Sequence, residues 1–163
     1  MRFRPVTAAD AEAIHAIYAP IVETSAISFE LEPPSVEEMA ARIERTIANY
    51  PWIASIDDDG ALAGYAYASA FRSRPAYRFT VETSIAIAPA HRGRGLALPL
   101  YEALMQELTR RDFHAAIAVI AMPNDASVAL HKRAGFRRVG VLQEVGLKFD
   151  QWRDVEIWER LLR

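Results

Sequence analysis

The most restrictive feature of this sequence is the segment RFTVETSIAIAPAHRGRGLALPLYEALMQEL, residues 78–108, in which an alternating pattern, a short loop with two glycines and a helical pattern follow one another. Alternation with a period of two is typical of a strand. One face of this predicted strand carries Phe79, Val81, Thr83, Ile85 and Ile87. Glu82 lies on the opposite face, mid-strand among apolar neighbours. Pro89 ends the strand, because proline cannot donate a hydrogen bond to a neighbouring strand.

A helix follows the two glycines and runs to about Arg111. Pro99 is tolerated in a first turn but would break a helix interior, so the helix begins near Leu96. The backbone N–H groups of residues 93–98 then meet at the positive end of a helix dipole, where glycines let a bulky phosphate approach. The apolar stripe of this helix consists of Leu96, Leu100, Ala103, Leu104 and Leu108.

The loop HRGRGLA therefore predicts an anion site, and its two arginines add charge-assisted donors. It lacks both the Lys-Ser/Thr ending of a Walker loop and the Gly-x-Gly-x-x-Gly spacing of a dinucleotide fold. The alternative interpretation is a flexible, solvated loop. Its position between a strand and an amphipathic helix favours the anion site.

Composition narrows the class of protein. A chain of 163 residues predicts one domain, residues 1–163, with a core of its own. A net charge of −2 argues against general binding of nucleic acid or of an anionic membrane. The absence of cysteine excludes disulfides and thiolate chemistry, and the four histidines lack ligand spacing, so we expect no metal. Without an apolar signal segment or a membrane-spanning run, a cytoplasmic location is expected.

The rest of the chain alternates helical and extended patterns. Predicted helices cover residues 8–23, 35–49 and 125–134, the first of them bent or interrupted by Pro20. Because an apolar strand at 115–121 follows the central helix, we expect a right-handed βαβ unit with parallel strands. The sequence thus predicts an α/β fold with a mixed, mostly antiparallel sheet flanked by helices. The other predicted extended segments are 2–6, 26–31, 52–56, 62–69, 136–149 and 155–162.

The strand VETSIAIAP followed by HRGRGLA resembles the acetyl-CoA loop of the GNAT acetyltransferase superfamily, and NDASVALHKRAGF resembles a second segment of that superfamily. The segments YPWIAS, FRSRPAY and GLKFDQWRDVEIW are similar to its phosphinothricin or methionine sulfoximine N-acetyltransferase branch. The resemblance covers nearly the whole chain. It implies a single-domain GNAT-like acyl-CoA N-acyltransferase fold, acetyl-CoA as co-substrate, a homodimer, and a role in antibiotic or herbicide resistance.

The resemblance also implies which residues bind the cofactor. By position, Ile85, Ala86 and Ile87 would pair with the pantetheine arm. Asn124 would add a polar contact, although an asparagine there also suits a turn or a helix cap. The phosphates would be held by Gly93, Arg94, Gly95, Leu96, Ala97 and Leu98.

Two residues are candidates for proton transfer. Glu82 is the stronger candidate for general base, because a carboxylate that is partly desolvated by its strand neighbours has a raised pKa. The alternatives are a solvated edge-strand glutamate or an ion-pair partner. His131 stands where many relatives have a tyrosine that protonates the leaving thiolate, so it is a candidate general acid or cofactor contact; a packing or surface role is the alternative.

For the acceptor, the resemblance implies a small amino-acid analogue of the phosphinothricin, methionine sulfoximine or methionine sulfone type. Its implied binding residues are Phe29, Arg72, Arg74, Tyr77, Glu82, Thr83 and Ser84. Lys148 and Trp152 would close the pocket or form a dimer contact. We expect direct transfer to an α-amino group, without an acyl-enzyme. The alternatives are another amine acceptor (another amino acid, an aminoglycoside, a polyamine or a protein N-terminus) and a non-catalytic acyl-CoA-binding module.

Overall fold

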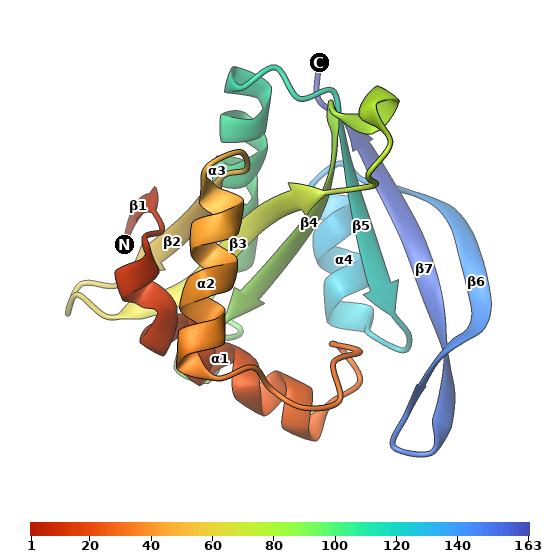
Figure 1. Ribbon diagram of the computed structural model, residues 1–163, viewed down its shortest axis with the longest axis horizontal. Coiled ribbons are helices and arrows are strands. Elements are labelled where there is room, and N and C mark those ends of the chain that lie inside the picture. Colours follow the sequence, from red (N-terminus) through yellow and green to blue (C-terminus); the bar gives the residue numbers. More distant parts are fainter.

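The computed structural model describes residues 1–163 as one seven-stranded sheet with helices on both faces (Figure 1). The predicted fold class is confirmed. The helices are α1 (Ala11–Thr24), α2 (Val36–Ile47), α3 (Ala97–Arg110) and α4 (Asp125–Arg133). The strands are β1 (Arg2–Pro5), β2 (Trp52–Ile56), β3 (Leu62–Ala70), β4 (Thr80–Ile87), β5 (Ala115–Ala121), β6 (Arg137–Lys148) and β7 (Gln151–Leu161).

The order of strands in the sheet is β1-β2-β3-β4-β5-β7-β6, and only the β4–β5 pair is parallel. Helix α3 connects these two strands, so the predicted βαβ unit is confirmed. The predicted hairpin of β2 and β3 is also present, and its turn ends at Gly60 with φ +86°. None of the helices combines the length and the apolar character that a membrane crossing requires.

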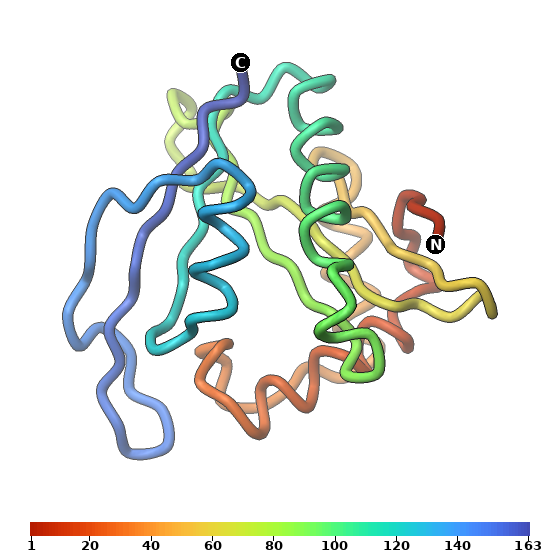
Figure 2. Tube along the Cα trace, turned by 180° about the vertical axis from the view of Figure 1, so that it is seen from behind, coloured from red at the N-terminus to blue at the C-terminus, as the bar shows by residue number.

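Each face of the sheet has its own core. Helices α1 and α2 cover one face, and Ile14, Ile17, Met39 and Ile43 pack there with side chains of β2 and β3. Helices α3 and α4 cover the other face, as the view from behind shows (Figure 2). A larger cluster fills that side, in which Leu100, Tyr101, Leu104, Met105 and Leu108 of α3 are almost fully buried.

Local signals in the sequence explain where the helices begin and end. The Ser35 side chain accepts a hydrogen bond of 3.1 Å from the Glu38 N–H, as its capping pattern predicts. Helix α3 begins at Ala97, which leaves Pro99 in its first turn. Gly135 follows α4 with φ +76°, a left-handed conformation that glycine adopts without steric cost.

Three expectations need correction in detail, two of them in full and one in part. Residues 26–31 form a bent loop between α1 and α2 rather than an extended segment. Of the two effects expected of Pro20, a bend or an interruption, the interruption is absent, because packing of the apolar stripe continues on both sides of Pro20. Strand β7 begins at Gln151, four residues before the predicted start at Val155, because Phe149 and Asp150 form the hairpin turn with φ values of +52° and +56°.

Candidate functional site

The candidate site begins where the two parallel strands separate. Pairing of β4 with β5 stops at Glu82 and Ile117. Beyond this point β4 pairs only with β3, and β5 only with β7, so the edges that face each other have no backbone partner (Figure 1). A cavity of about 380 Å³ lies at this opening, lined on the strands by Glu82, Thr83, Ser84, Ile85, Ala86, Ala118, Val119, Ile120 and Ala121.

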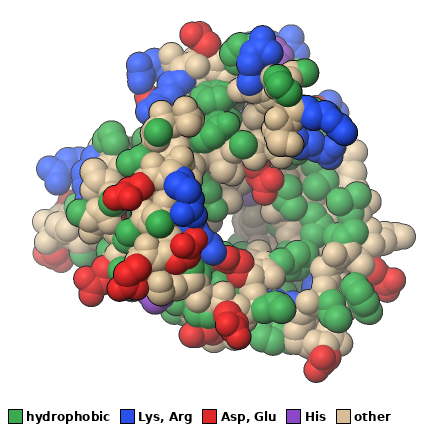
Figure 3. All heavy atoms as spheres, in the orientation of Figure 1, with side chains coloured by type: hydrophobic (Ala, Val, Ile, Leu, Met, Phe, Trp, Pro, Cys, Tyr) green, Lys and Arg blue, Asp and Glu red, His purple; other side chains and the backbone are tan.

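Other elements complete the walls of this cavity. Helix α4 and the turn before it contribute Asn124, Ser127 and His131, and the loop between α1 and α2 contributes Ile27, Ser28 and Phe29. Figure 3 shows a hollow near the middle of the face that α1 and α2 cover. Charged side chains of both signs line one border of this hollow, and hydrophobic side chains line the other.

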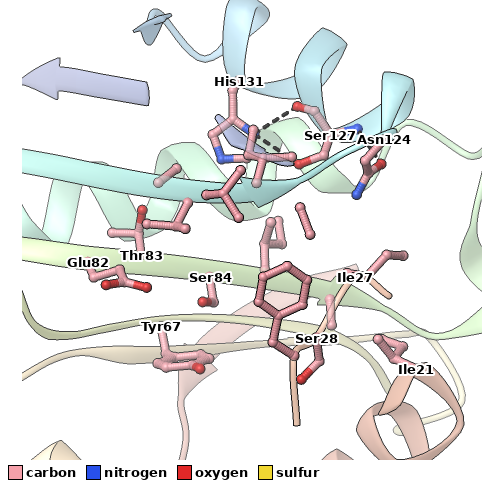
Figure 4. Close-up of a pocket in the computed structure, with 18 of the residues that line it drawn as sticks. Ile21, Ile27, Ser28, Tyr67, Glu82, Thr83, Ser84, Asn124, Ser127 and His131 are labelled. Atoms are coloured by element: carbon pink, nitrogen blue, oxygen red, sulfur yellow. Dashed lines mark hydrogen bonds between the residues drawn. The ribbon is translucent and has the colours of Figure 1, made fainter. Parts of the chain in front are cut away.

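Glu82 lies in this cavity, at the last residue of β4 that pairs with β5 (Figure 4). It is half-buried, and burial raises the pKa of its carboxyl. No cation forms an ion pair with it. A carboxylate with a raised pKa and no fixed partner is suited to accept a proton from a bound group near neutral pH.

The glycine-rich loop leads from the end of β4 to α3. Gly93 and Gly95 have φ values of +73° and +76°, and no atom lies within 4 Å of the position that a Cβ would occupy on either. The N–H groups of residues 93–96 donate to no backbone carbonyl, and those of Ala97 and Leu98 belong to the first turn of a helix. Leu96 is buried and anchors the loop. Free donors at the positive end of a helix are suited to hold an anion.

Asn124 caps the start of helix α4, as the alternative interpretation of this residue predicted. Its side-chain oxygen accepts a hydrogen bond of 3.1 Å from the Ser127 N–H. The same side chain also lines the cavity, where Figure 4 shows it next to Ser127. Capping therefore leaves the amide nitrogen of Asn124 available to a bound molecule.

His131 is buried, and both of its ring nitrogens have partners in the protein. Nδ1 lies 2.7 Å from the Ser127 carbonyl oxygen, an acceptor, so Nδ1 carries the hydrogen. Nε2 then accepts from the Tyr101 hydroxyl at 3.1 Å. Burial lowers the pKa of the imidazole, which favours the neutral form. The Thr83 hydroxyl extends this network, 2.7 Å from the Tyr101 oxygen.

The structure brings together only some of the residues predicted for the acceptor. Phe29, Thr83 and Ser84 line the cavity with Glu82. Arg72, Arg74 and Tyr77 do not line it; Arg72 instead lies over the rings of Phe71 and Tyr77, at 5.1 and 5.7 Å from their centroids. Of the residues predicted for the pantetheine, Ile85 and Ala86 line the cavity, and Ile87 packs against the core.

Lys148 and Trp152 have different surroundings. Lys148 is buried, and its ammonium donates to the carbonyl oxygens of Val22 and Ser28, each at 2.7 Å. It holds the loop that borders the cavity without lining the cavity itself. Trp152 is 61% exposed on the β6–β7 hairpin.

Sequence reasoning missed several residues of the site. Tyr18, Tyr65 and Tyr67 line the cavity from α1 and β3, and Ser127 fixes the tautomer of His131. Tyr65 and Tyr67 alternate on β3, which indicates one shared face, but only the observed pairing of β3 with β4 places that face beside Glu82. Tyr18 carries no such signal, because its place depends on how α1 crosses the sheet.

Comparison with known proteins gives consistent results. A family model described as "Acetyltransferase (GNAT) domain" matches residues 3–158. The chain is 37% identical to the phosphinothricin N-acetyltransferase of Streptomyces viridochromogenes, over 98% of this chain and 87% of that protein. It is 34% identical to the L-methionine sulfoximine/L-methionine sulfone acetyltransferase of Salmonella typhimurium, over 95% of this chain and 91% of that protein. A crystal structure of a phosphinothricin acetyltransferase from Sinorhizobium meliloti in complex with acetyl-CoA has a TM-score of 0.95 and 40% identity, covering 99% of this chain and 88% of that one.

Proposed function

This chain belongs to the GNAT acetyltransferase family and is an N-acetyltransferase; from that premise we propose that it transfers the acetyl group of acetyl-CoA to the α-amino group of a small amino-acid analogue. The observation that carries the proposal is the opening between β4 and β5, which joins a half-buried carboxylate to a loop of free N–H groups.

The residues of this opening fit acetyl-CoA. The unpaired edge of β4 from Thr83 to Ile87 offers backbone groups to the amides of a pantetheine arm, as another strand would. The donors of residues 93–98 suit the pyrophosphate. When bound, acetyl-CoA supplies an acetyl thioester that an amine attacks directly. No cysteine competes as an acceptor of the acetyl group.

Glu82 is our candidate for the general base. An amine attacks a thioester only as the free base, so the site must take up a proton from the ammonium form of the acceptor. The carboxylate of Glu82 accepts this proton directly or through water. Backbone N–H groups on the unpaired edge of β4 then stabilise the negative charge that develops on the carbonyl oxygen.

His131 has a less direct role in this scheme. With Nδ1–H donated to Ser127 and Nε2 occupied by Tyr101, the neutral ring has no proton to give in the observed arrangement. Its action as an acid would require protonation of Nε2 as well as exchange of the Tyr101 contact for a bound thiolate. We therefore assign the essential proton transfer to Glu82 and treat His131 as a cofactor contact.

A small acceptor fits the site better than a polymer. The cavity of about 380 Å³ has walls from several elements and is mainly apolar, with Phe29 and Tyr67 near Glu82. Such a pocket is the size that small molecules occupy in proteins. Relatives named for phosphinothricin and for methionine sulfoximine and sulfone align with 98% and 95% of this chain, at 37% and 34% identity, which supports acceptors of this type.

We also propose that two copies of the chain associate through β6. This edge strand of the sheet and the adjoining hairpin carry many exposed apolar side chains, an arrangement that monomers rarely leave open. They are Val139, Val141, Leu142, Val145, Leu147, Phe149 and Trp152. Sedimentation of the wild type and of Val141→Glu tests this, with a dimer and a monomer expected. The cytoplasmic location stays a prediction.

Release of the coenzyme A thiol, measured with phosphinothricin, methionine sulfoximine and methionine sulfone, tests the function. We expect turnover with at least one of them and a product acetylated at the α-nitrogen. Turnover only with other amines would move the chain to another acceptor class. Binding of acetyl-CoA without turnover on any amine would leave a non-catalytic binding module.

A further inference from the structure

We propose that Gly146 sets the width of the acceptor pocket, because its missing side chain leaves the space that the ring of Phe29 occupies. This inference rests on the proposed function. The contact between Gly146 and Phe29 would then determine which acceptors fit the pocket. Phe29 lines the cavity, whereas Gly146 lies on β6 outside it.

The contact between the two residues is unusually close. A Cβ built on Gly146 would lie 2.7 Å from Cδ2 of Phe29 and closer still to two further ring atoms. Real Cβ atoms do not approach carbon so closely. Gly140 on the same strand has no atom within 4 Å of its Cβ position. The requirement for glycine at 146 therefore comes from Phe29 and not from the strand.

The loop that carries Phe29 is fixed on both sides of it. The Lys148 ammonium holds the Ser28 carbonyl oxygen at 2.7 Å, and the Tyr18 hydroxyl lies 2.8 Å from the Ser28 side chain. Glu30 on the other side is held by Arg42 through two hydrogen bonds of 2.6 and 3.0 Å. Since the Ser28 carbonyl and the Glu30 side chain are both held, we expect a side chain at position 146 to displace the ring and not the loop.

Gly146 closes one side of the ring, and Phe29 is 37% exposed, so the directions left to a displaced ring are the cavity and the solvent; we infer that it moves toward the cavity. The wall formed by Phe29 and Ile27 would move toward the space in which we place the acceptor side chain. The cofactor groups lie on β4, on α3 and at the start of α4, whereas the three atoms nearest the Cβ position of Gly146 all belong to Phe29. Width at the acceptor end and affinity for acetyl-CoA are thus set by different residues.

The test compares Gly146→Ala with Gly140→Ala. Steady-state kinetics with phosphinothricin and methionine sulfone should show an acceptor KM raised about tenfold or more in Gly146→Ala, since one methyl group in an apolar pocket has an effect of this size. The KM for acetyl-CoA should stay within about twofold of the wild-type value in both variants. An acceptor KM in Gly146→Ala that equals that of Gly140→Ala, or falls below it, overturns the inference.

The double variant Phe29→Leu/Gly146→Ala tests the mechanism and removes the clash if the single variant folds poorly. Because leucine is shorter than phenylalanine, we expect its acceptor KM to equal that of Phe29→Leu within about threefold. If Gly146→Ala raises the acceptor KM by the same factor in the Phe29→Leu background as in the wild type, Gly146 acts independently of the ring and the inference fails. If the wild type turns over an acceptor but the variants do not show these changes in KM, the inference fails and the proposed function stands. A wild type that is inactive on every acceptor overturns both the proposed function and the inference.

Discussion

The two ends of the candidate site are built differently. Apart from Asn124, the cofactor end lies within residues 83–98, where strand, loop and helix follow one another along the chain. The acceptor end joins segments that are far apart, as the hydrogen bond between Lys148 and Ser28, 120 residues away, illustrates. Glycines of the cofactor end have open space around them, whereas Gly146 at the acceptor end has none.

This difference suggests a division of tasks. Backbone N–H groups at the cofactor end are free of backbone partners. They would bind the pyrophosphate, which is the same in every reaction, whatever side chains surround it. At the acceptor end, the polar groups of the loop are already used in holding it, and packing sets the shape of the pocket. Substitutions at that end should therefore alter which acceptor binds without altering acetyl-CoA binding.

Glu82 lies between the two ends, so its substitution should have the largest effect. Glu82→Gln removes the carboxylate and keeps the shape, and we expect kcat/KM to fall about 10²–10³-fold, the size of a general-base contribution. Both KM values should change little. The control is Glu44→Gln, which alters an exposed glutamate of α2 and should leave kinetics unchanged. A loss of less than about threefold would remove Glu82 from the proton transfer.

The same residue predicts a pH dependence. Only the carboxylate form accepts a proton, and burial raises the pKa of Glu82 above its ordinary value of 4.5. Activity should therefore fall as pH decreases through this raised pKa, at a higher pH than an ordinary glutamate would give. Profiles of kcat/KM against pH should show this acidic limb in the wild type and lose it in Glu82→Gln.

The cofactor end alone is tested by Gly95→Ala. A Cβ at φ +76° strains the backbone and occupies the space that a phosphate would approach, so we expect the KM for acetyl-CoA to rise about tenfold, with an unchanged acceptor KM. Gly60→Ala is a matched control, with φ +86° and open space in the β2–β3 turn. Both should lose a similar amount of stability, and equal KM values in the two would contradict a cofactor role for the loop.

The two ends of the site also differ in how well the sequence predicts them. The strand at residues 80–87, the helix start near Leu96 and the parallel β5 are all local patterns, and each is present in the structure. The prediction of an anion site at the loop followed from glycine spacing and a helix terminus alone. Resemblance to a family was needed to identify the anion as a phosphate of acetyl-CoA.

The acceptor end could not be predicted in this way. Residues 26–31 carry an extended pattern, yet the loop is shaped by Lys148 and by the contact between Phe29 and Gly146, which no spacing in the sequence encodes. Arginines of the 71–77 loop matched the chemistry of an anionic acceptor, but do not line the cavity. The chemistry of an acceptor can suggest the type of residue that binds it, but tertiary packing determines which residue of that type lies at the site.

Lys148→Met tests the acceptor end with a smaller expected effect. The variant keeps the length of the side chain but removes two hydrogen bonds from a buried ammonium to the Val22 and Ser28 carbonyl oxygens, which should cost about 2–3 kcal/mol of stability. The loosened loop should raise the acceptor KM severalfold and leave the KM for acetyl-CoA unchanged. Thermal melting and kinetics of the exposed Lys132→Met provide the control. Equal rises in both KM values would mean that Lys148 supports the whole fold and not one end.

The smallest effect concerns His131, which lies in the framework that both ends share. Its pKa is lowered in the folded protein, so between that pKa and the ordinary value of about 6.5 the unfolded chain binds a proton that the folded one does not. Stability should therefore fall as pH decreases below about 6.5, by at most about 1.4 kcal/mol at pH 5.5 from this residue. Urea unfolding of His131→Gln at pH 7.5 and 5.5 should show a smaller decrease than that of the wild type, whereas the exposed His114→Gln should not differ from it. A decrease in His131→Gln as large as that of the wild type would mean that folding does not lower the pKa of His131. A larger decrease in His131→Gln would mean that the folded protein favours the charged ring, which has a proton to give to a leaving thiolate.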